Sequence, residues 1–216
     1  MLQRKHMRTV LYLAILVLVL WGTASYGTGR SPVGYPGSSD GMDAGVDLQG
    51  TPSPEFELTN QRDERVSLSD YRGKAIVLTF LDGHCDDVCP MLMETMARTE
   101  KILPEEAKDQ VAFVVISVNP WLDRVGKPAF ISMHPEFVAP EEWDFLTGTL
   151  EELQPVWKNY YIAVEAEETD GDLVSPLHTE GYYLIDPQGN QQYYYGGSVS
   201  EQILAKRLQE MLAASS

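Results

Sequence analysis

Two uninterrupted apolar runs place the strongest constraint on how this 216-residue chain folds. Residues 75–81 read AIVLTFL and residues 111–118 read VAFVVISV, and both runs are rich in β-branched side chains. A strand that is apolar at every position is typical of a parallel sheet covered on both faces. Between the runs, residues 92–103 place apolar side chains at helical spacing. Strand, helix and strand in this order predict a right-handed parallel crossover.

The C-terminal part of the chain predicts an antiparallel hairpin followed by a helix. Strands are expected at 181–185 and 191–195, because DPQGN between them supplies turn residues. Ser200 is placed to cap an amphipathic helix over 201–212. The fold class is therefore α/β, with a central, mostly parallel sheet, an antiparallel C-terminal hairpin and flanking helices. Weaker patterns predict strands at 55–58 and 65–68 and helices at 128–133 and 150–161, the last kinked or shortened by Pro155.

The N-terminal 26 residues have the composition of an export signal or a membrane anchor. Three basic residues precede the apolar run VLYLAILVLVLW at 10–21. Residues 9–25 form a stretch that the apolar core of a bilayer can accommodate. Its length meets the lower limit of about 17 residues for a membrane span. An uncleaved anchor over 1–26 is favoured, with the rest of the chain on the extracytoplasmic or periplasmic side. Secretion after cleavage of the signal is the alternative.

The next segment, 27–53, is rich in Gly, Pro and Ser and lacks a regular apolar period. Such a composition predicts a flexible tether, with a root-mean-square reach of about 30 Å. The remaining residues, 54–216, suit one domain with a full-sized core.

The charge of the chain is strongly acidic. It has 16 basic and 32 acidic residues, and four of the basic ones lie within the first thirty residues, which contain no acidic residue. Nucleic acid is not expected as a partner, because binding to its phosphate backbone requires Lys and Arg. The acidity suits a solvated surface or a basic protein partner.

Both cysteines of the chain, Cys85 and Cys89, lie where the first apolar run gives way to a helix that Pro90 is placed to start. Backbone N–H groups at a helix start favour anions, so raised thiolate character is expected. Four helical residues rise about 6 Å, toward the long end of disulfide Cα separations of about 4.4–6.8 Å. A metal ion between the sulfurs relaxes that limit. The pair can be a redox couple, two metal ligands, buried residues or a structural disulfide, although so short a loop gains little stability from a disulfide.

Three histidines are candidates for a further ligand. His84 adjoins Cys85, and in an extended backbone its side chain points the other way. It is therefore expected to contact a metal ligand rather than the metal, or to face solvent. His134 falls in a loop and is expected at the surface. His178 precedes the predicted strand 181–185, and sheet pairing could carry it to the cysteine loop.

The segment DYRGKAIVLTFLDGHCDDVCPMLM resembles the copper-site segment of the Sco/SenC family, membrane-tethered thioredoxin-like proteins that help to deliver copper to cytochrome c oxidase. The resemblance continues through VVISVNPWLD, DFLTGTLEELQPVWKNY and LHTEGYYLIDPQG and covers about residues 54–213. It implies a thioredoxin-like fold and a role in assembling the CuA site of the oxidase. It also implies that Cys85, Cys89 and His178 bind one copper ion. Two soft thiolates and an imidazole suit Cu(I), with Cu(II) also open.

The chain departs from the family pattern at two places. The family often has an acidic residue where this chain has Asn119, although Asp123 is present four residues later. It often has proline after the first cysteine, where Asp86 stands here. Asp86 and Asp87 are expected to oppose thiolate formation and to attract a cation. Thioethers of Met91, Met93 and Met96 recur at helical spacing and are expected in the core.

The leading hypothesis is an exported, membrane-tethered copper metallochaperone rather than an enzyme. It transfers one copper ion to an oxidase subunit by ligand exchange, and oxidation of its cysteines blocks loading. The alternative is an extracytoplasmic thiol–disulfide oxidoreductase in which Cys85 and Cys89 act on the cysteines of a client or redox partner. The spacing favours the chaperone, because redox enzymes use CxxC and because His178 then has a role. A thiol peroxidase and a non-catalytic interaction module are weaker alternatives.

Overall fold

A six-stranded mixed sheet forms the centre of the domain, in the order β1-β12-β11-β4-β5-β6. The computed structural model describes residues 45–85, 87–123, 143–165, 168–169, 172–173 and 176–215. The sheet strands are β1 (Val46–Pro52), β4 (Ala75–Leu81), β5 (Val111–Ser117), β6 (Trp143–Leu146), β11 (Gly181–Ile185) and β12 (Asn190–Gly196). β4, β5 and β6 are parallel, whereas β11, β12 and β1 are antiparallel to their neighbours.

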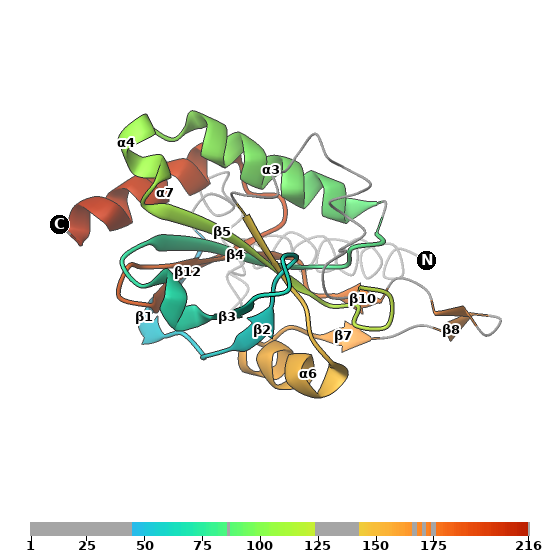
Figure 1. Cartoon of the computed structure of the whole chain (residues 1–216). Coiled ribbons are helices and arrows are strands. Elements are labelled where there is room, and N and C mark those ends of the chain that lie inside the picture. The colour runs from blue at the N-terminus through green and yellow to red at the C-terminus, as the bar shows by residue number, and fades with distance from the viewer. Residues whose placement is uncertain are drawn as a thin grey trace, which may run out of the picture. The chain divides into compact units, whose positions relative to one another are not determined.

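Helices cover both faces of this sheet (Figure 1). One face carries α3 (Val88–Ile102) and α7 (Glu201–Ala214), and the other carries α6 (Leu150–Asn159). The short elements are β2 (Glu57–Thr59), β3 (Arg65–Ser67), η1 (Leu68–Tyr71), α4 (Glu105–Lys108), β7 (Val164–Glu165), β8 (Glu168–Thr169), β9 (Asp172–Leu173) and β10 (Leu177–His178). The predicted α/β class, parallel crossover, C-terminal hairpin and β2–β3 pair are confirmed.

Alternate residues of β4 face two separate hydrophobic cores. Val77 and Leu81 pack in the core beneath α3 and α7. Leu78 and Phe80 pack in the core on the α6 side. Every residue of β4 is buried, as its unbroken apolar sequence predicts.

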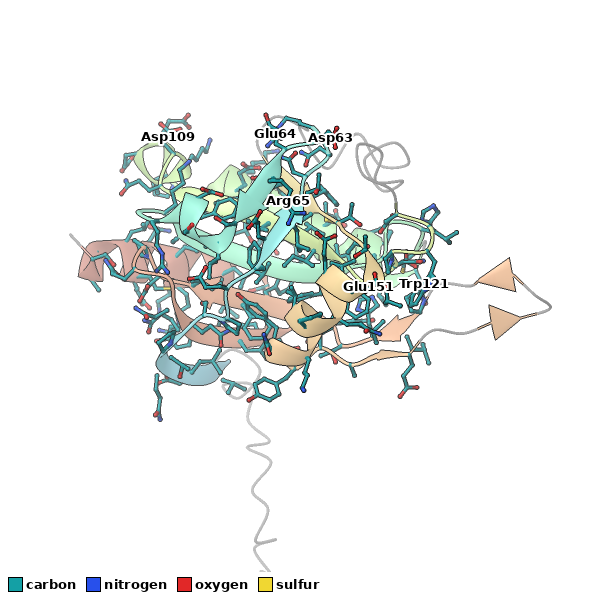
Figure 2. All side chains as sticks on the ribbon, turned by 60° about the horizontal axis from the view of Figure 1, so that its bottom comes forward. Asp63, Glu64, Arg65, Asp109, Trp121 and Glu151 are labelled. Atoms are coloured by element: carbon teal, nitrogen blue, oxygen red, sulfur yellow. The ribbon has the colours of Figure 1, made fainter. Side chains whose placement is uncertain are left out.

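The antiparallel pairing of β11 with β4 determines which loops meet at one edge of the sheet. Tyr182 lies opposite Thr79, and the Thr79 hydroxyl donates a hydrogen bond of 2.8 Å to the Gly181 carbonyl. The beginning of β11 therefore lies beside the end of β4. In Figure 2, Trp121 marks this edge of the sheet, because it lies shortly after the end of β5. Asp109, which lies just before β5, marks the opposite end of the sheet.

The boundary predicted between tether and domain is wrong for residues 46–52. These residues form the edge strand β1, which pairs with β12. The sequence pattern does not predict β1, because a bulge at Gln49 and Gly50 interrupts the strand, and both residues have positive φ. The side chains of β1 therefore do not alternate regularly between the two faces of the sheet. The predicted anchor, the rest of the tether up to residue 44 and the predicted helix at 128–133 lie outside the described residues.

Two smaller expectations also differ from the structure. Helix α6 continues through Pro155 and ends at Asn159, two residues earlier than predicted. The sequence patterns predict no strand in the acidic segment 165–172, but its described residues contribute to the short strands β7, β8 and β9. Among the described helices, none has both the length and the apolar character that a membrane crossing requires.

The two N-cap residues Thr149 and Ser200 allow a matched test of helix capping. The Thr149 hydroxyl accepts a hydrogen bond from the Glu152 N–H, and the Glu152 carboxylate accepts one from the Thr149 N–H. Ser200 begins α7 without a side-chain cap. We expect Thr149→Ala to lower the free energy of unfolding by about 1 kcal/mol and Ser200→Ala to change it by less than about 0.5 kcal/mol. Urea denaturation of the full chain measures both, and equal losses would contradict the assignment.

Candidate metal centre

The two cysteines lie between the end of β4 and the first turn of α3. The Cys85 N–H donates a hydrogen bond of 3.3 Å to the Asp82 carbonyl, which turns the chain directly after the strand. Helix α3 begins at Val88, so Cys89 is already helical and Pro90 follows it. The prediction that Pro90 starts the helix is off by two residues. Proline is tolerated throughout a first turn, because the N–H groups there have no helical partner.

His178 comes from a distant part of the sequence and lies beside Cys89. Its Nε2 atom is 3.9 Å from the Cys89 sulfur. Strand β10, which contains His178, pairs with β7 through His178 and Val164, and the chain then runs into β11. A sulfur about 2.3 Å and a nitrogen about 2.0–2.1 Å from one ion are about 3.6–3.8 Å apart at bond angles near 110–120°. The two groups are therefore already close to the separation that a shared ion requires.

A backbone contact selects the tautomer of His178. Its Nδ1 atom lies 3.0 Å from the Thr179 carbonyl oxygen. A carbonyl oxygen only accepts hydrogen bonds, so Nδ1 carries the proton in this contact. In the neutral ring, Nε2 then has a free lone pair, and this is the atom that faces Cys89. Such an outer hydrogen bond is what orients a metal-binding imidazole.

The two thiols differ in acidity. The pKa of Cys85 falls from 9.0 to about 6, mainly because of the hydrogen bond with the Cys89 side chain and then because of the backbone N–H groups of Cys89, Asp87 and Val88. The pKa of Cys89 is raised, because its proton is shared with Cys85 and because it is buried. Cys85 is half-buried and Cys89 is fully buried. Cys85 is thus the thiolate at neutral pH, and Cys89 is the donor that stabilises it.

One of the two acidic neighbours, Asp87, acts differently from the prediction. Asp87 affects Cys85 through its backbone N–H, and the net shift of the Cys85 pKa is downward. Of the three methionines expected in the core, Met93 and Met96 are buried, but Met91 is 60% exposed. His134 and Asp86 lie outside the described residues.

Asn119 donates a hydrogen bond of 3.0 Å to the buried Asp82 carboxylate. An aspartate at position 119 would instead place a second carboxylate against Asp82. The departure from the family pattern therefore has a physical reason in this chain.

Together with His84 and Asp123, Asp82 forms a polar cluster that was not predicted from the sequence. The signal was available, because Asp82 and Asn119 each follow a predicted strand and parallel strands end at the same edge.

Comparison with known proteins gives the family of the chain. Residues 47–213 match the family model described as SCO1/SenC. The chain belongs to this family. The chain is 27% identical over 165 residues to the mitochondrial SCO2 homolog of Mus musculus, covering 74% of this chain and 62% of that protein. It is 31% identical over 140 residues to a putative copper-binding protein of Stutzerimonas stutzeri, covering 63% and 65%. The chain thus spans less than two thirds of the length of these two relatives.

Solved structures of Sco proteins share the fold of this SCO1/SenC family member. The structure of Bradyrhizobium japonicum ScoI with copper bound superposes with a TM-score of 0.64 at 26% identity, covering 74% of this chain and 99% of that one. A SCO1/SenC family lipoprotein of Bacillus anthracis gives a TM-score of 0.64 at 27% identity, covering 76% and 96%. The thioredoxin-like fold that the sequence resemblance implied is confirmed.

The lowered pKa of Cys85 predicts its reactivity. In the reduced full chain, alkylation of Cys85 by iodoacetamide should increase with pH through a midpoint near 6, because the thiolate is the nucleophile. Cys89→Ala removes the main hydrogen bond and should move the midpoint up toward about 8.5. Mass spectrometry of the labelled cysteine at each pH measures both curves. Two curves with the same midpoint would contradict the role given to Cys89.

The Tyr182 hydroxyl donates a hydrogen bond of 3.0 Å to the Leu92 carbonyl, which fastens β11 to α3 one turn after Cys89. Tyr183, on the other face of β11, makes the same kind of bond to the Tyr160 carbonyl. Each tyrosine-to-phenylalanine substitution should cost about 1 kcal/mol of stability. Only Tyr182→Phe should also weaken Cu(I) binding, by about fivefold, because it alone loosens the contact between Cys89 and His178. Chelator competition on both variants measures this, and equal affinities would show that the Tyr182 bond does not position the site.

Proposed function

We propose that this chain is a copper metallochaperone in which Cys85, Cys89 and His178 bind one copper ion as cargo. The observation that supports this most is the 3.9 Å approach of His178 Nε2 to the Cys89 sulfur, made by residues 89 positions apart. Two sulfur ligands and one nitrogen ligand select Cu(I) over harder ions. Copper-bound structures of the Bradyrhizobium japonicum and Arabidopsis thaliana ScoI proteins support the same cargo.

The unequal burial of the two thiols suits transfer of the ion to a partner. Cys89 and its helix hold one sulfur inside the core, whereas Cys85 lies on the loop with part of its surface exposed. A recipient ligand can therefore approach on the Cys85 side while Cys89 and His178 still hold the ion. A three-ligand site also leaves room for an incoming ligand, unlike a closed four-ligand zinc site. We infer exchange of ligands with an oxidase subunit as the delivery step, in line with the family to which the chain belongs.

Oxidation of the two cysteines to a disulfide would remove both sulfur ligands. Both are free thiols in the structure. Loading with copper thus requires the reduced pair, and the redox state of the compartment regulates it. The basic and apolar start of the sequence supports a membrane-anchored protein with this domain on the extracytoplasmic side.

The His178 ligand can be tested against the other histidine in the C-terminal half of the chain. The reduced full chain is titrated with Cu(I) under anaerobic conditions against a competing chelator. The parent should bind one equivalent, and His178→Ala should bind at least about tenfold more weakly, since even outer partners of metal ligands contribute that much. His134→Ala serves as the matched control and should bind like the parent. No effect of His178→Ala would overturn the three-ligand site.

Thiol–disulfide exchange is the second candidate, and the difference between the two thiol pKa values favours it. A reactive Cys85 with a lowered pKa beside a buried Cys89 is the arrangement of an attacking and a resolving thiol. Cys89→Ser should then trap a mixed disulfide between Cys85 and a client protein, whereas Cys85→Ser should trap none. The reduction potential adds a second criterion, because a value below about −300 mV marks a structural disulfide.

A further inference from the structure

A second group of potential metal ligands lies directly before the cysteine loop. Asp82, His84 and Asp123 each direct one ligand atom into a common space, and these atoms lie within 4.8 Å of one another. Asp82 follows β4, and Asp123 follows β5, so the parallel pairing of Leu81 with Ser117 brings their segments together. The group contains neither of the cysteines and does not include His178.

Asp123 has one carboxylate oxygen that is fully engaged and one that is not. Its Oδ2 atom accepts hydrogen bonds from the Ser117 hydroxyl at 2.7 Å and from the Gly83 N–H at 3.1 Å. Its Oδ1 atom is buried and has no hydrogen-bond partner among the described residues. The residue as a whole is 5% exposed. A buried carboxylate oxygen without a hydrogen-bond partner is costly, so Asp123 Oδ1 is a candidate ligand for a cation.

The unpartnered atom faces a second one. His84 Nδ1 is also buried without a hydrogen-bond partner within the described part of the chain. It lies 3.4 Å from Asp123 Oδ1 and 3.8 Å from Asp82 Oδ1. Two ligands about 2.1 Å from a tetrahedral ion are about 3.4 Å apart. The separations are thus longer than a hydrogen bond and of the size that a shared ion produces.

The backbone at Gly83 permits this arrangement. A Cβ atom at position 83 would lie 2.1 Å from Asp123 Oδ1, so any side chain there would push the carboxylate away. The charge of the group also points to a cation. Asp82 is fully buried, and its Oδ1 atom accepts hydrogen bonds from the His84 N–H and the Asn119 amide. The second buried carboxylate, that of Asp123, has its Oδ1 atom 3.4 Å from the His84 ring, so two carboxylates and one imidazole face the same space.

We propose that Asp82, His84 and Asp123 form a second metal site, which binds a divalent first-row cation such as Cu²⁺ or Zn²⁺. One imidazole and two carboxylates are harder ligands than the thiolates, and they suit these divalent ions rather than Cu(I). Among such ions, Cu²⁺ binds most tightly to nitrogen and oxygen ligands. Three protein ligands leave a fourth position for water. The proposal does not depend on copper binding by Cys85, Cys89 and His178.

The test isolates the second site by removing the thiols. The full chain carrying Cys85→Ser and Cys89→Ser is titrated with Cu²⁺ alone and followed by electron paramagnetic resonance. We expect one equivalent bound with a nitrogen-and-oxygen signal. In this background, His84→Ala and Asp123→Asn should each weaken binding at least tenfold. His178→Ala should leave the signal unchanged, and so should Glu180→Gln, which removes the same charge as Asp123→Asn from a residue outside the group.

His84→Ala is the decisive variant, because the His84 side chain is 34% exposed and its removal does not disturb the bonds that Asp123 makes to Ser117 and Gly83. Thermal unfolding of each variant shows whether it is folded. A signal that survives His84→Ala, or one that disappears with His178→Ala, would overturn the proposal. No uptake of Cu²⁺ by the thiol-free chain would also overturn it and would assign the space to a proton or a water molecule between Asp123 and His84. Cu(I) binding by the parent would be unaffected by that result.

Discussion

The antiparallel pairing of β11 with β4 is the constraint on which the cysteine and histidine site depends. It places Tyr182 opposite Thr79, and the Thr79 hydroxyl adds a hydrogen bond to the Gly181 carbonyl. If β11 ran parallel to β4, its first residues would lie at the other end of the sheet. Because it runs antiparallel, the chain just before β11 arrives beside the chain just after β4. His178 thereby reaches Cys89 across 89 residues of sequence.

The same edge of the sheet brings together two sets of potential metal ligands with different chemistry. The end of β4 and the start of α3 supply two sulfur atoms, and the segment before β11 supplies the His178 nitrogen. The ends of β4 and β5 supply the carboxylates of Asp82 and Asp123, with His84 between Asp82 and the cysteines. The first set is soft and suits Cu(I), whereas the second is harder and suits divalent ions. The Asn119 amide donates a hydrogen bond to Asp82 and adds no negative charge at this edge.

Much of this arrangement could be predicted from local patterns in the sequence. The continuous apolar run at 75–81 identifies β4, and the two cysteines follow it at a strand-to-helix junction. His178 could be selected from the three candidate histidines only through resemblance to a family, since its approach depends on the register of β11. The parallel strands place Asp82 and Asn119 at one edge, but the Asp82, His84 and Asp123 group was missed because Asp123 lies six residues after β5, and its position depends on the fold of that loop. The edge strand β1 was missed because its bulge and its two positive φ angles remove the alternation that identifies a strand.

X-ray absorption at the copper edge of the Cu(I)-loaded full chain tests the central claim most directly, because it counts the atoms bound to the ion. The account predicts two sulfur ligands and one nitrogen ligand in the parent chain. It also predicts that the nitrogen ligand is lost in His178→Ala while both sulfur ligands remain. A site with sulfur ligands alone in the parent, or a nitrogen ligand that persists in His178→Ala, would contradict it.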